Sequence, residues 1–184
     1  MPLISPVTSS DAPEQSKKIL EAVEKKLGRV PNLVGALAHS PAALRFYLGQ
    51  VEALSAGSLA PQLREQIALA TAGINRCDYC ACAHTFAGKA LGLTPEELSE
   101  NLAGRSLNSQ TQAALSFATA IVKNQGRLSD ESVQAVRAAG YNEAAVVEII
   151  AHVAMNVFTN YFNHIAGTPI DFPLVTTASC ETHP

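Results

Sequence analysis

The amino-acid sequence predicts an all-α fold, and three observations support this prediction. Apolar residues recur at helical intervals, as in the series Leu63, Ile67, Leu69, Ala70 and Ile74. Prolines open such runs and glycines close them, as is typical of helix starts and ends. No segment alternates between apolar and polar residues as a half-buried strand does, and no Asn-Gly or Asp-Gly hairpin signal occurs.

The expected helices are bounded by short-range signals. Thr94 and Glu97 form a capping box, in which each side chain takes a free backbone N–H of the first turn. Ser109 with Gln112, and Ser129 with the two acids that follow it, are similar start signals. Prolines mark five starts and glycines four ends: Pro13, Pro31, Pro41, Pro61, Pro95, Gly28, Gly92, Gly126 and Gly140. The helices expected in chain order are 13–27, 31–39, 41–56, 61–75, 78–91, 95–103, 109–125, 130–139 and 143–165.

Length and composition favour one globular domain. The 184 residues fit a single domain over 1–175, followed by a mobile tail over 176–184. Hydrophobic residues make up 47% and charged residues 16%, which excludes disorder and leaves apolar side chains for a subunit interface. A net charge of -3, 5% aromatic residues and the absence of Trp argue against nucleic-acid binding.

The longest apolar stretch, 144–162, is expected to be a buried helix. It contains Glu148, His152, Asn156 and Asn160, which a bilayer tolerates poorly, so we expect no membrane partner. Residues 1–11 lack the basic segment and apolar run of a signal peptide. A cytoplasmic location is therefore the expectation.

Three of the four cysteines, Cys77, Cys80 and Cys82, fall within six positions. In a reducing compartment such a cluster is typical of redox chemistry or metal binding. Cys82 lies five residues after Cys77 and faces another side of the helix, so we expect it to be an unreactive packing thiol. Cys180 lies in the tail and has no motif around it.

A helical hairpin places four polar side chains in a row. Gly73 and Asn75 disfavour a helix interior, so one helix should end there and the next begin near Cys77. If the two helices pack antiparallel, Glu65 lies level with His84 because both helices rise 1.5 Å per residue. Cys80 and His84 are i,i+4 neighbours, and Cys77 lies one turn before Cys80. The expected order is Glu65, His84, Cys80, Cys77.

That order suits thiol redox chemistry. A helix N-terminus and a nearby imidazole both favour the thiolate. His84 is placed to accept the Cys80 proton, and Glu65 to orient the ring and stabilise the imidazolium. Attack of Cys80 on a peroxide gives a sulfenic acid, which Cys77 can convert to a disulfide.

Other interpretations of the same residues stay open. Cys77, Cys80 and His84 could bind zinc with His152 or Glu65 as a fourth ligand. The cysteines could also pack without chemistry, or form a disulfide reductase or redox sensor. Tyr79, between the two cysteines, is a possible auxiliary residue of the proton relay, although packing is the favoured role.

A second polar series lies on the expected helix 143–165. His152, Asn156, Asn160 and His164 follow one another at intervals of four. Buried polar groups need partners, so a hydrogen-bond ladder to another helix or subunit is the favoured interpretation. The alternative places His152 or Asn156 in the pocket beside Cys80.

The motif formed by Glu65, Cys77-x-x-Cys80 and His84 resembles the signature of the AhpD-like alkylhydroperoxidases, which belong to the carboxymuconolactone decarboxylase superfamily. The motif covers 65–84, within an expected redox core over 45–103. The segments Val30-Pro31-Asn32-Leu33, 160–168 and Ile170-Asp171-Phe172-Pro173 resemble the longer "peroxidase-related" branch of this family.

The resemblance implies a helical homo-oligomer, a trimer or hexamer, that reduces peroxides without a metal or organic cofactor. It implies that Cys80 is the peroxidatic cysteine, Cys77 the resolving one, and that Glu65 and His84 form the relay. It also implies reduction by a dithiol or a lipoyl-type protein. The best-known members carry a His where this chain has Tyr79, whereas the decarboxylases lack the CxxC.

Overall fold

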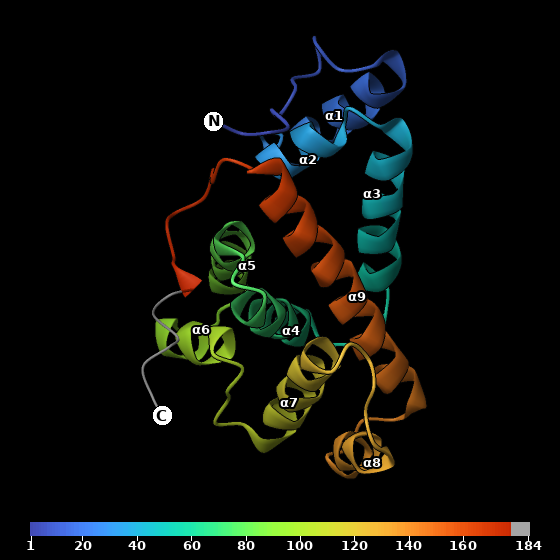
Figure 1. The fold of residues 1–184 in the computed structure, drawn as a ribbon, viewed down its shortest axis with the longest axis vertical. Helices are drawn as coiled ribbons and strands as arrows, with labels where there is room; N and C mark the ends of the chain where they lie inside the picture. Colours follow the sequence, from blue (N-terminus) through green and yellow to red (C-terminus); the bar gives the residue numbers. More distant parts are fainter. Residues whose placement is uncertain (178–184) are drawn as a thin grey trace.

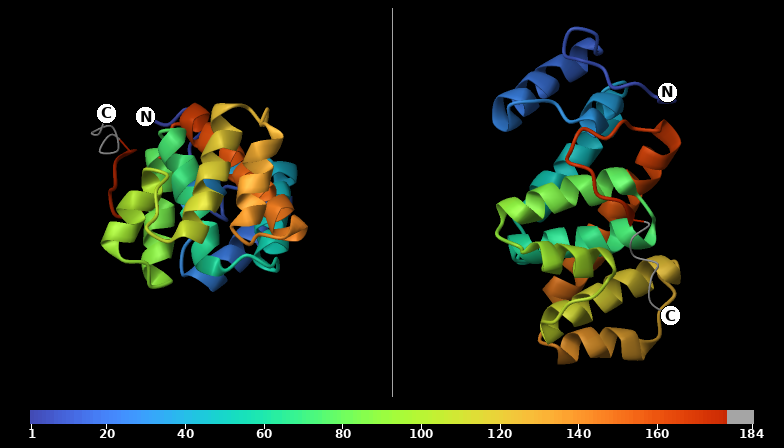
Figure 2. Two further views of the ribbon diagram at one scale, coloured as in Figure 1. Left: turned by 90° about the horizontal axis from the view of Figure 1, so that it is seen from below. Right: turned by 90° about the vertical axis from the view of Figure 1, so that its left-hand side faces the viewer.

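The computed structural model describes residues 1–177, which form nine helices (Figure 1). The helices are α1 (Glu14–Leu27), α2 (Asn32–Leu37), α3 (Pro41–Ser55), α4 (Pro61–Ile74), α5 (Asp78–Ala90), α6 (Pro95–Leu102), α7 (Ser109–Lys123), α8 (Asp130–Ala138) and α9 (Glu143–Ala166). The all-α prediction is confirmed, and each helix begins and ends within two residues of its expected bounds. Helices α1 and α2 lie at one end of the molecule and α8 at the other (Figure 2).

Helix α4 lies between two hydrophobic cores. One face of α4 contributes Leu69 and Ala72 to a core shared with the N-terminal helices and α5. The opposite face contributes Leu63 and Ile67 to a core shared with α7, α8 and the first half of α9. Because both faces of α4 are packed, the helix holds its side chains in defined positions.

Helix α9 spans most of the length of the fold (Figure 1), and its side chains pack in both cores. By length and composition alone it could cross a membrane. In the fold it packs against α3, α4, α5, α7 and α8, and it buries Asn156, Asn160 and Asn163. The expectation that this stretch forms a helix packed within the fold, with its polar residues Asn156 and Asn160 buried, is confirmed.

The capping predictions are confirmed at α6 and corrected at α7. Thr94 Oγ1 accepts the Glu97 N–H at 3.2 Å, and Glu97 Oε2 accepts the Thr94 N–H at 2.9 Å. At α7 the N-cap is Asn108 rather than Ser109, and its Oδ1 accepts the N–H of Thr111 at 2.9 Å. An Asn caps a helix as well as a Ser does, and it precedes Ser109 by one residue. Ser129 stands at the N-cap of α8 without a side-chain cap bond.

After α9 the chain turns back over α5 as an extended segment, residues 168–177, here called the C-terminal strap. Asp171 Oδ2 accepts hydrogen bonds from Arg29 Nη1 at 2.6 Å and from the Asn32 N–H at 3.1 Å. The N–H and the hydroxyl of Thr177 both donate to Asp78 Oδ1 at 2.8 Å. The strap is thus tied to α2 and to the start of α5. Residues 178–184 of the expected tail, with Cys180, lie outside the described residues.

Candidate active site

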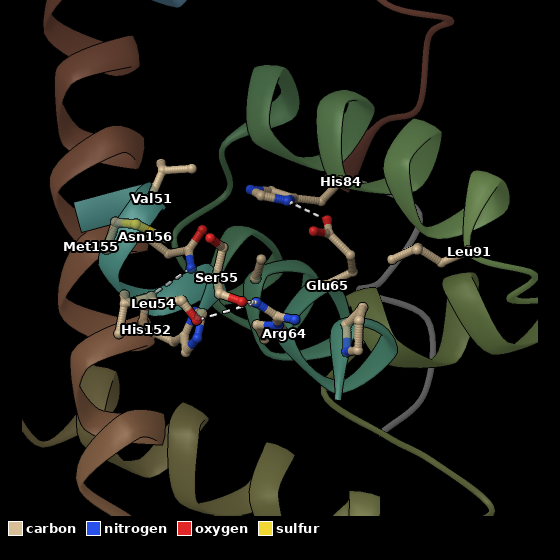
Figure 3. Close-up of a pocket in the computed structure, with 12 residues that line it drawn as sticks. Val51, Leu54, Ser55, Arg64, Glu65, His84, Leu91, His152, Met155 and Asn156 are labelled. Carbon is tan, nitrogen blue, oxygen red and sulfur yellow. Dashed lines mark hydrogen bonds and ion pairs between the residues drawn. The ribbon is translucent and has the colours of Figure 1, made fainter. Parts of the chain in front are cut away.

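The connection between α4 and α5 places the four motif residues. Helix α4 ends at the C-cap Asn75, and Arg76 takes a positive φ of 54° in the tight turn that follows. Cys77 is the N-cap of α5. The two helices pack as an antiparallel pair, and His84 Nδ1 lies 2.8 Å from Glu65 Oε2 (Figure 3). The predicted proximity of these two side chains is confirmed.

Both cysteines of the CxxC are buried, with 2% of Cys77 and 3% of Cys80 exposed, and neither is in a disulfide. Cys80 lies in the first turn of α5, and the Cys77 thiol hydrogen-bonds to its sulfur. This hydrogen bond is the main cause that lowers the pKa of Cys80 to about 6 against the opposing effect of burial. The charge of His84 and the amides of Asn163 and Asn160 lower it further. The pKa of Cys77 is raised, because its proton is held by Cys80 and its sulfur is buried.

The pKa of His84 is raised above its ordinary value, and this is the net result of opposing effects. Burial disfavours the imidazolium, but the charge and hydrogen bond of Glu65 outweigh this effect. The charge of Cys80 and a hydrogen bond that the ring donates to Asn156 act in the same direction. The arrangement therefore stabilises a thiolate and an imidazolium side by side, which is the charge pair that a nucleophilic cysteine needs.

One residue that contacts the reactive sulfur was not among the candidate site residues. Asn163 on α9 donates its Nδ2–H to Cys80 Sγ at 3.2 Å and is itself 4% exposed. It lies three residues after Asn160 on the polar side of the helix. The signal that could have found it is its presence in the segment that resembles the peroxidase-related branch.

The polar series of α9 makes the hydrogen-bond ladder that was the favoured interpretation. Asn160 Oδ1 accepts from Asn75 Nδ2 at 2.9 Å, and His164 Nε2 lies 2.9 Å from the carbonyl oxygen of Asn75. These contacts are the expected interhelical ladder. Farther along the helix, His152 and Asn156 line a cavity together with His84, whereas the alternative had placed them beside Cys80, which does not line it.

Tyr79 and Cys82 connect α5 to other segments. The Tyr79 hydroxyl accepts the Leu33 N–H at 3.0 Å, and its ring packs edge-on against Phe172 of the strap at 5.7 Å. Burial raises the pKa of Tyr79, so its hydroxyl stays neutral. Cys82 Sγ donates to the Val175 carbonyl oxygen and accepts the Val175 N–H. Both side chains therefore attach the first turns of α5 to their surroundings.

Tyr47 of α3 is a second neighbour of the site that the sequence did not reveal. Burial is the main cause that raises its pKa to about 12, and the negative charges of Cys80 and Glu65 add to the shift. A neutral phenol thus lies close to both charged groups. Nothing in the spacing of α3 relative to the CxxC indicated this contact.

A cavity of about 270 Å³ opens beside the relay (Figure 3). Glu65 and His84 form one side of it, and Arg64 and His152 form another. Its apolar walls come from Val51, Leu54, Leu91 and Met155. Neither sulfur of the CxxC lines this cavity; His84 does.

Within residues 1–177, the side chains that could bind a metal ion do not lie together at one place. No three side chains of His, Cys, Asp or Glu there form a group that could hold a metal ion. His84 is paired with Glu65 through Nδ1, and the Nε2 of His152 is buried without a hydrogen-bond partner. The geometry of this part of the chain therefore does not support the zinc interpretation.

Residues 37–124 match the model of the carboxymuconolactone decarboxylase family. This segment of the chain belongs to that family. It contains the α4–α5 hairpin and the whole Glu65–His84 motif, so the family inferred from the motif is confirmed. Among curated proteins, none shows significant similarity to the chain.

Several solved structures share the fold of this chain. A peroxidase-related protein with an alkylhydroperoxidase AhpD core, from Ralstonia eutropha JMP134, is 24% identical with a TM-score of 0.82 over 91% of this chain and 93% of its own. A peroxidase-related protein from Silicibacter sp. TM1040 is 23% identical with a TM-score of 0.79 over 91% of each chain. The debrominase Bmp8, in complex with 2,3,4-tribromopyrrole, is 22% identical with a TM-score of 0.77 over 97% of this chain and 95% of its own. At these identities the likeness shows the AhpD-like fold.

Proposed function

We propose that the protein is a thiol-dependent peroxidase that reduces hydrogen peroxide or alkyl hydroperoxides through a disulfide of Cys77 and Cys80. The observation that carries the proposal is the pairing of Glu65 with His84 at 2.8 Å next to a cysteine whose pKa is lowered to about 6. At neutral pH Cys80 is then mostly a thiolate, the form that attacks a peroxide.

The proposed catalytic cycle has three steps: oxidation of Cys80, formation of the disulfide and reduction of the disulfide. The Cys80 thiolate attacks the terminal oxygen of the hydroperoxide, so an S–O bond forms as the O–O bond breaks. The His84 imidazolium gives its proton to the leaving alkoxide, which departs as an alcohol, and Glu65 stabilises the imidazolium until then. The Cys77 sulfur next attacks the Cys80 sulfenic acid, and water leaves as the disulfide forms. An external dithiol, free or as a protein-bound lipoyl group, reduces the disulfide and is itself oxidised.

Cysteine variants test this proposal. Peroxide consumption with a dithiol donor is expected to stop in Cys80→Ser. In Cys77→Ser a sulfenic acid is expected to accumulate at Cys80, detectable by a dimedone adduct in the mass spectrum. Cys82→Ser is the matched control, because Cys82 contacts only the strap among the hydrogen bonds described for it. Full activity in Cys80→Ser would refute the assignment.

A disulfide reductase or redox sensor with the same cysteines is the alternative. Burial of both sulfurs favours small substrates over a protein disulfide. Steady turnover of peroxide distinguishes a catalyst from a sensor, which is oxidised once for each protein chain. Halogenated pyrroles belong in the same substrate panel, because the debrominase Bmp8 has the same fold.

We further propose that the chain forms a homo-oligomer, a trimer or hexamer, in the cytoplasm. Large apolar side chains on the outer faces of α3 and α9 support this proposal: Phe46, Val147, Ile150, Tyr161 and Ile165 are 45% to 68% exposed. Association of subunits would remove exposed apolar side chains of this kind from water. Light scattering coupled to size-exclusion chromatography measures the subunit number, and a monomer contradicts this part.

A further inference from the structure

The cavity beside His84 has a positively charged side that the peroxidase chemistry does not use. Arg64 precedes Glu65 on α4, and both side chains line the cavity (Figure 3). Glu65 is paired with His84, whereas Arg64 has no carboxylate partner within residues 1–177. A partly buried guanidinium without a counterion attracts an anion.

The structure holds Arg64 in place while leaving part of it available. Its Nη1 donates to the carbonyl oxygens of Leu54 and Ser55 at 3.2 and 2.7 Å, at the C-terminal end of α3. Its Nε is buried without a hydrogen-bond partner, and its Nη2 makes no hydrogen bond to the described part of the chain. Because two hydrogen bonds fix the guanidinium, little entropy is lost when it binds a ligand.

The other polar groups around the cavity do not compete for the anion. Burial is the main cause that lowers the pKa of His152, and the charge of Arg64 adds to it, so His152 is neutral at pH 7. The Glu65 carboxylate, the nearest negative charge on the same helix, is balanced by His84 at 2.8 Å. Arg64 is thus the side chain of this cavity that carries a full positive charge without a paired carboxylate.

We infer that Arg64 is a specificity-determining residue and that the cavity takes organic hydroperoxides that carry a carboxylate. This inference deepens the proposed function and rests on it. The carboxylate lies at Arg64, the carbon skeleton lies against Val51, Leu91 and Met155, and the hydroperoxide faces His84. A cavity of about 270 Å³ holds a small organic molecule of this kind. Arg64 also offsets the repulsion between an anionic substrate and the Cys80 thiolate.

A pair of substrates tests the inference on the unaltered protein. A benzylic hydroperoxide with a para-carboxylate is compared with its methyl ester, which is neutral and otherwise similar. We expect kcat/KM to be about 10-fold or more higher for the acid, the effect of one charge-assisted hydrogen-bonded contact. The preference is expected to shrink as the salt concentration rises, because salt screens the ion pair. Equal kcat/KM for the acid and the ester would overturn the inference.

Variants of Arg64 test whether the preference for the acid over the ester depends on this side chain. Arg64→Gln is expected to lower kcat/KM about 10-fold for the acid and by much less for the ester, whereas Arg64→Lys retains part of the preference. Arg127→Gln, at an exposed arginine outside the cavity, is the matched control. Circular dichroism verifies that the variants fold. If Arg64→Gln does not fold, Arg64→Lys and the substrate pair decide. An equal loss for acid and ester in a folded variant contradicts the inference.

Calorimetry separates this inference from the proposed function. Para-toluate carries the carboxylate but no peroxide, so its binding does not depend on cysteine chemistry. Binding to the wild type that is lost in Arg64→Gln supports the anion site even if neither hydroperoxide is consumed, in which case the peroxidase proposal alone fails. No binding of para-toluate to the wild type overturns the anion site.

Discussion

Asn163 donates a hydrogen bond to the sulfur of Cys80 across 3.2 Å, and so connects α9 to the first turn of α5. The two residues are 83 positions apart in the sequence. The amide sits at the last third of a helix whose middle contributes Asn156 and His152 to the cavity. One helix therefore supplies both a hydrogen-bond donor to the Cys80 sulfur and part of the wall of the cavity beside His84.

Removal of this donor is expected to raise the pKa of Cys80. In Asn163→Leu the side chain keeps its branched shape and number of heavy atoms but loses its N–H groups, so the thiolate loses a charge-assisted hydrogen bond. The expected increase is about one pKa unit, equivalent to about 1.4 kcal/mol. Thiolate absorbance at 240 nm during a pH titration measures it. Asn124→Leu, at the exposed C-cap of α7, is the control. An unchanged pKa in Asn163→Leu contradicts the assigned contact.

The reactivity of Cys80 is expected to rise with pH through about 6, the value to which its pKa is lowered. The sign follows from the chemistry, since the thiolate is the nucleophile and protonation below that pH removes it. Cys77 and Cys82 have raised pKa values and contribute no thiolate at neutral pH. Stopped-flow peroxide consumption between about pH 4 and pH 8 gives the profile. A rate that first rises near the ordinary thiol pKa would show that the environment of Cys80 is misassigned.

Replacing Glu65 by Gln is expected to slow peroxide reduction about 100-fold, the effect of losing assistance by an effective acid–base group. The amide keeps the size of the side chain but not the charge that raises the pKa of His84. Single-turnover measurement of sulfenic acid formation isolates this step from reduction by the dithiol. Glu52→Gln, on exposed α3 surface, is the matched control and keeps the wild-type rate.

The Glu65–His84 pair also contributes to folding stability, and the direction of its pH dependence follows from the raised pKa of His84. The folded-state pKa of His84 is raised above its unfolded value, so its contribution to stability is fully present below about pH 6.5 and is lost as pH rises through the folded value. The difference in unfolding free energy between the wild type and Glu65→Gln should therefore shrink as the pH increases. Urea denaturation at about pH 6 and about pH 9 measures it. A difference that grows with pH contradicts the pairing.

Two helical glycines are expected to respond to Ala in opposite directions. A Cβ at Gly73 of α4 would lie 1.8 Å from the carbonyl oxygen of Leu102, which cannot move without displacing the end of α6. Gly73→Ala is expected to cost about 3 kcal/mol. At Gly49 of α3 nothing lies within 4 Å of the added atom, so Gly49→Ala should stabilise by about 0.5–1 kcal/mol. Thermal unfolding of the two variants, with the wild type between them, is the measurement.

The sequence alone determined the helices and the centre of the site. Helix bounds depend on local signals such as the Thr94–Glu97 capping box, which act within one turn. The proximity of Glu65 and His84 depends only on a tight turn after Ile74 and on the rise of two helices. The error at Ser109 has the same local origin, because Asn108 offers an equivalent cap one residue earlier.

Only the tertiary structure decided which distant side chains surround that centre. Asn163, Tyr47 and the strap reach α5 from segments 30 or more positions away, and a helical period says which face a residue is on but not what that face meets. The contact between α9 and α5 depends on the packing of side chains in the two hydrophobic cores on either side of α4. Likewise Arg64, which the sequence presents as one more cation on a helix, became a candidate anion site only when the fold placed its guanidinium beside the cavity.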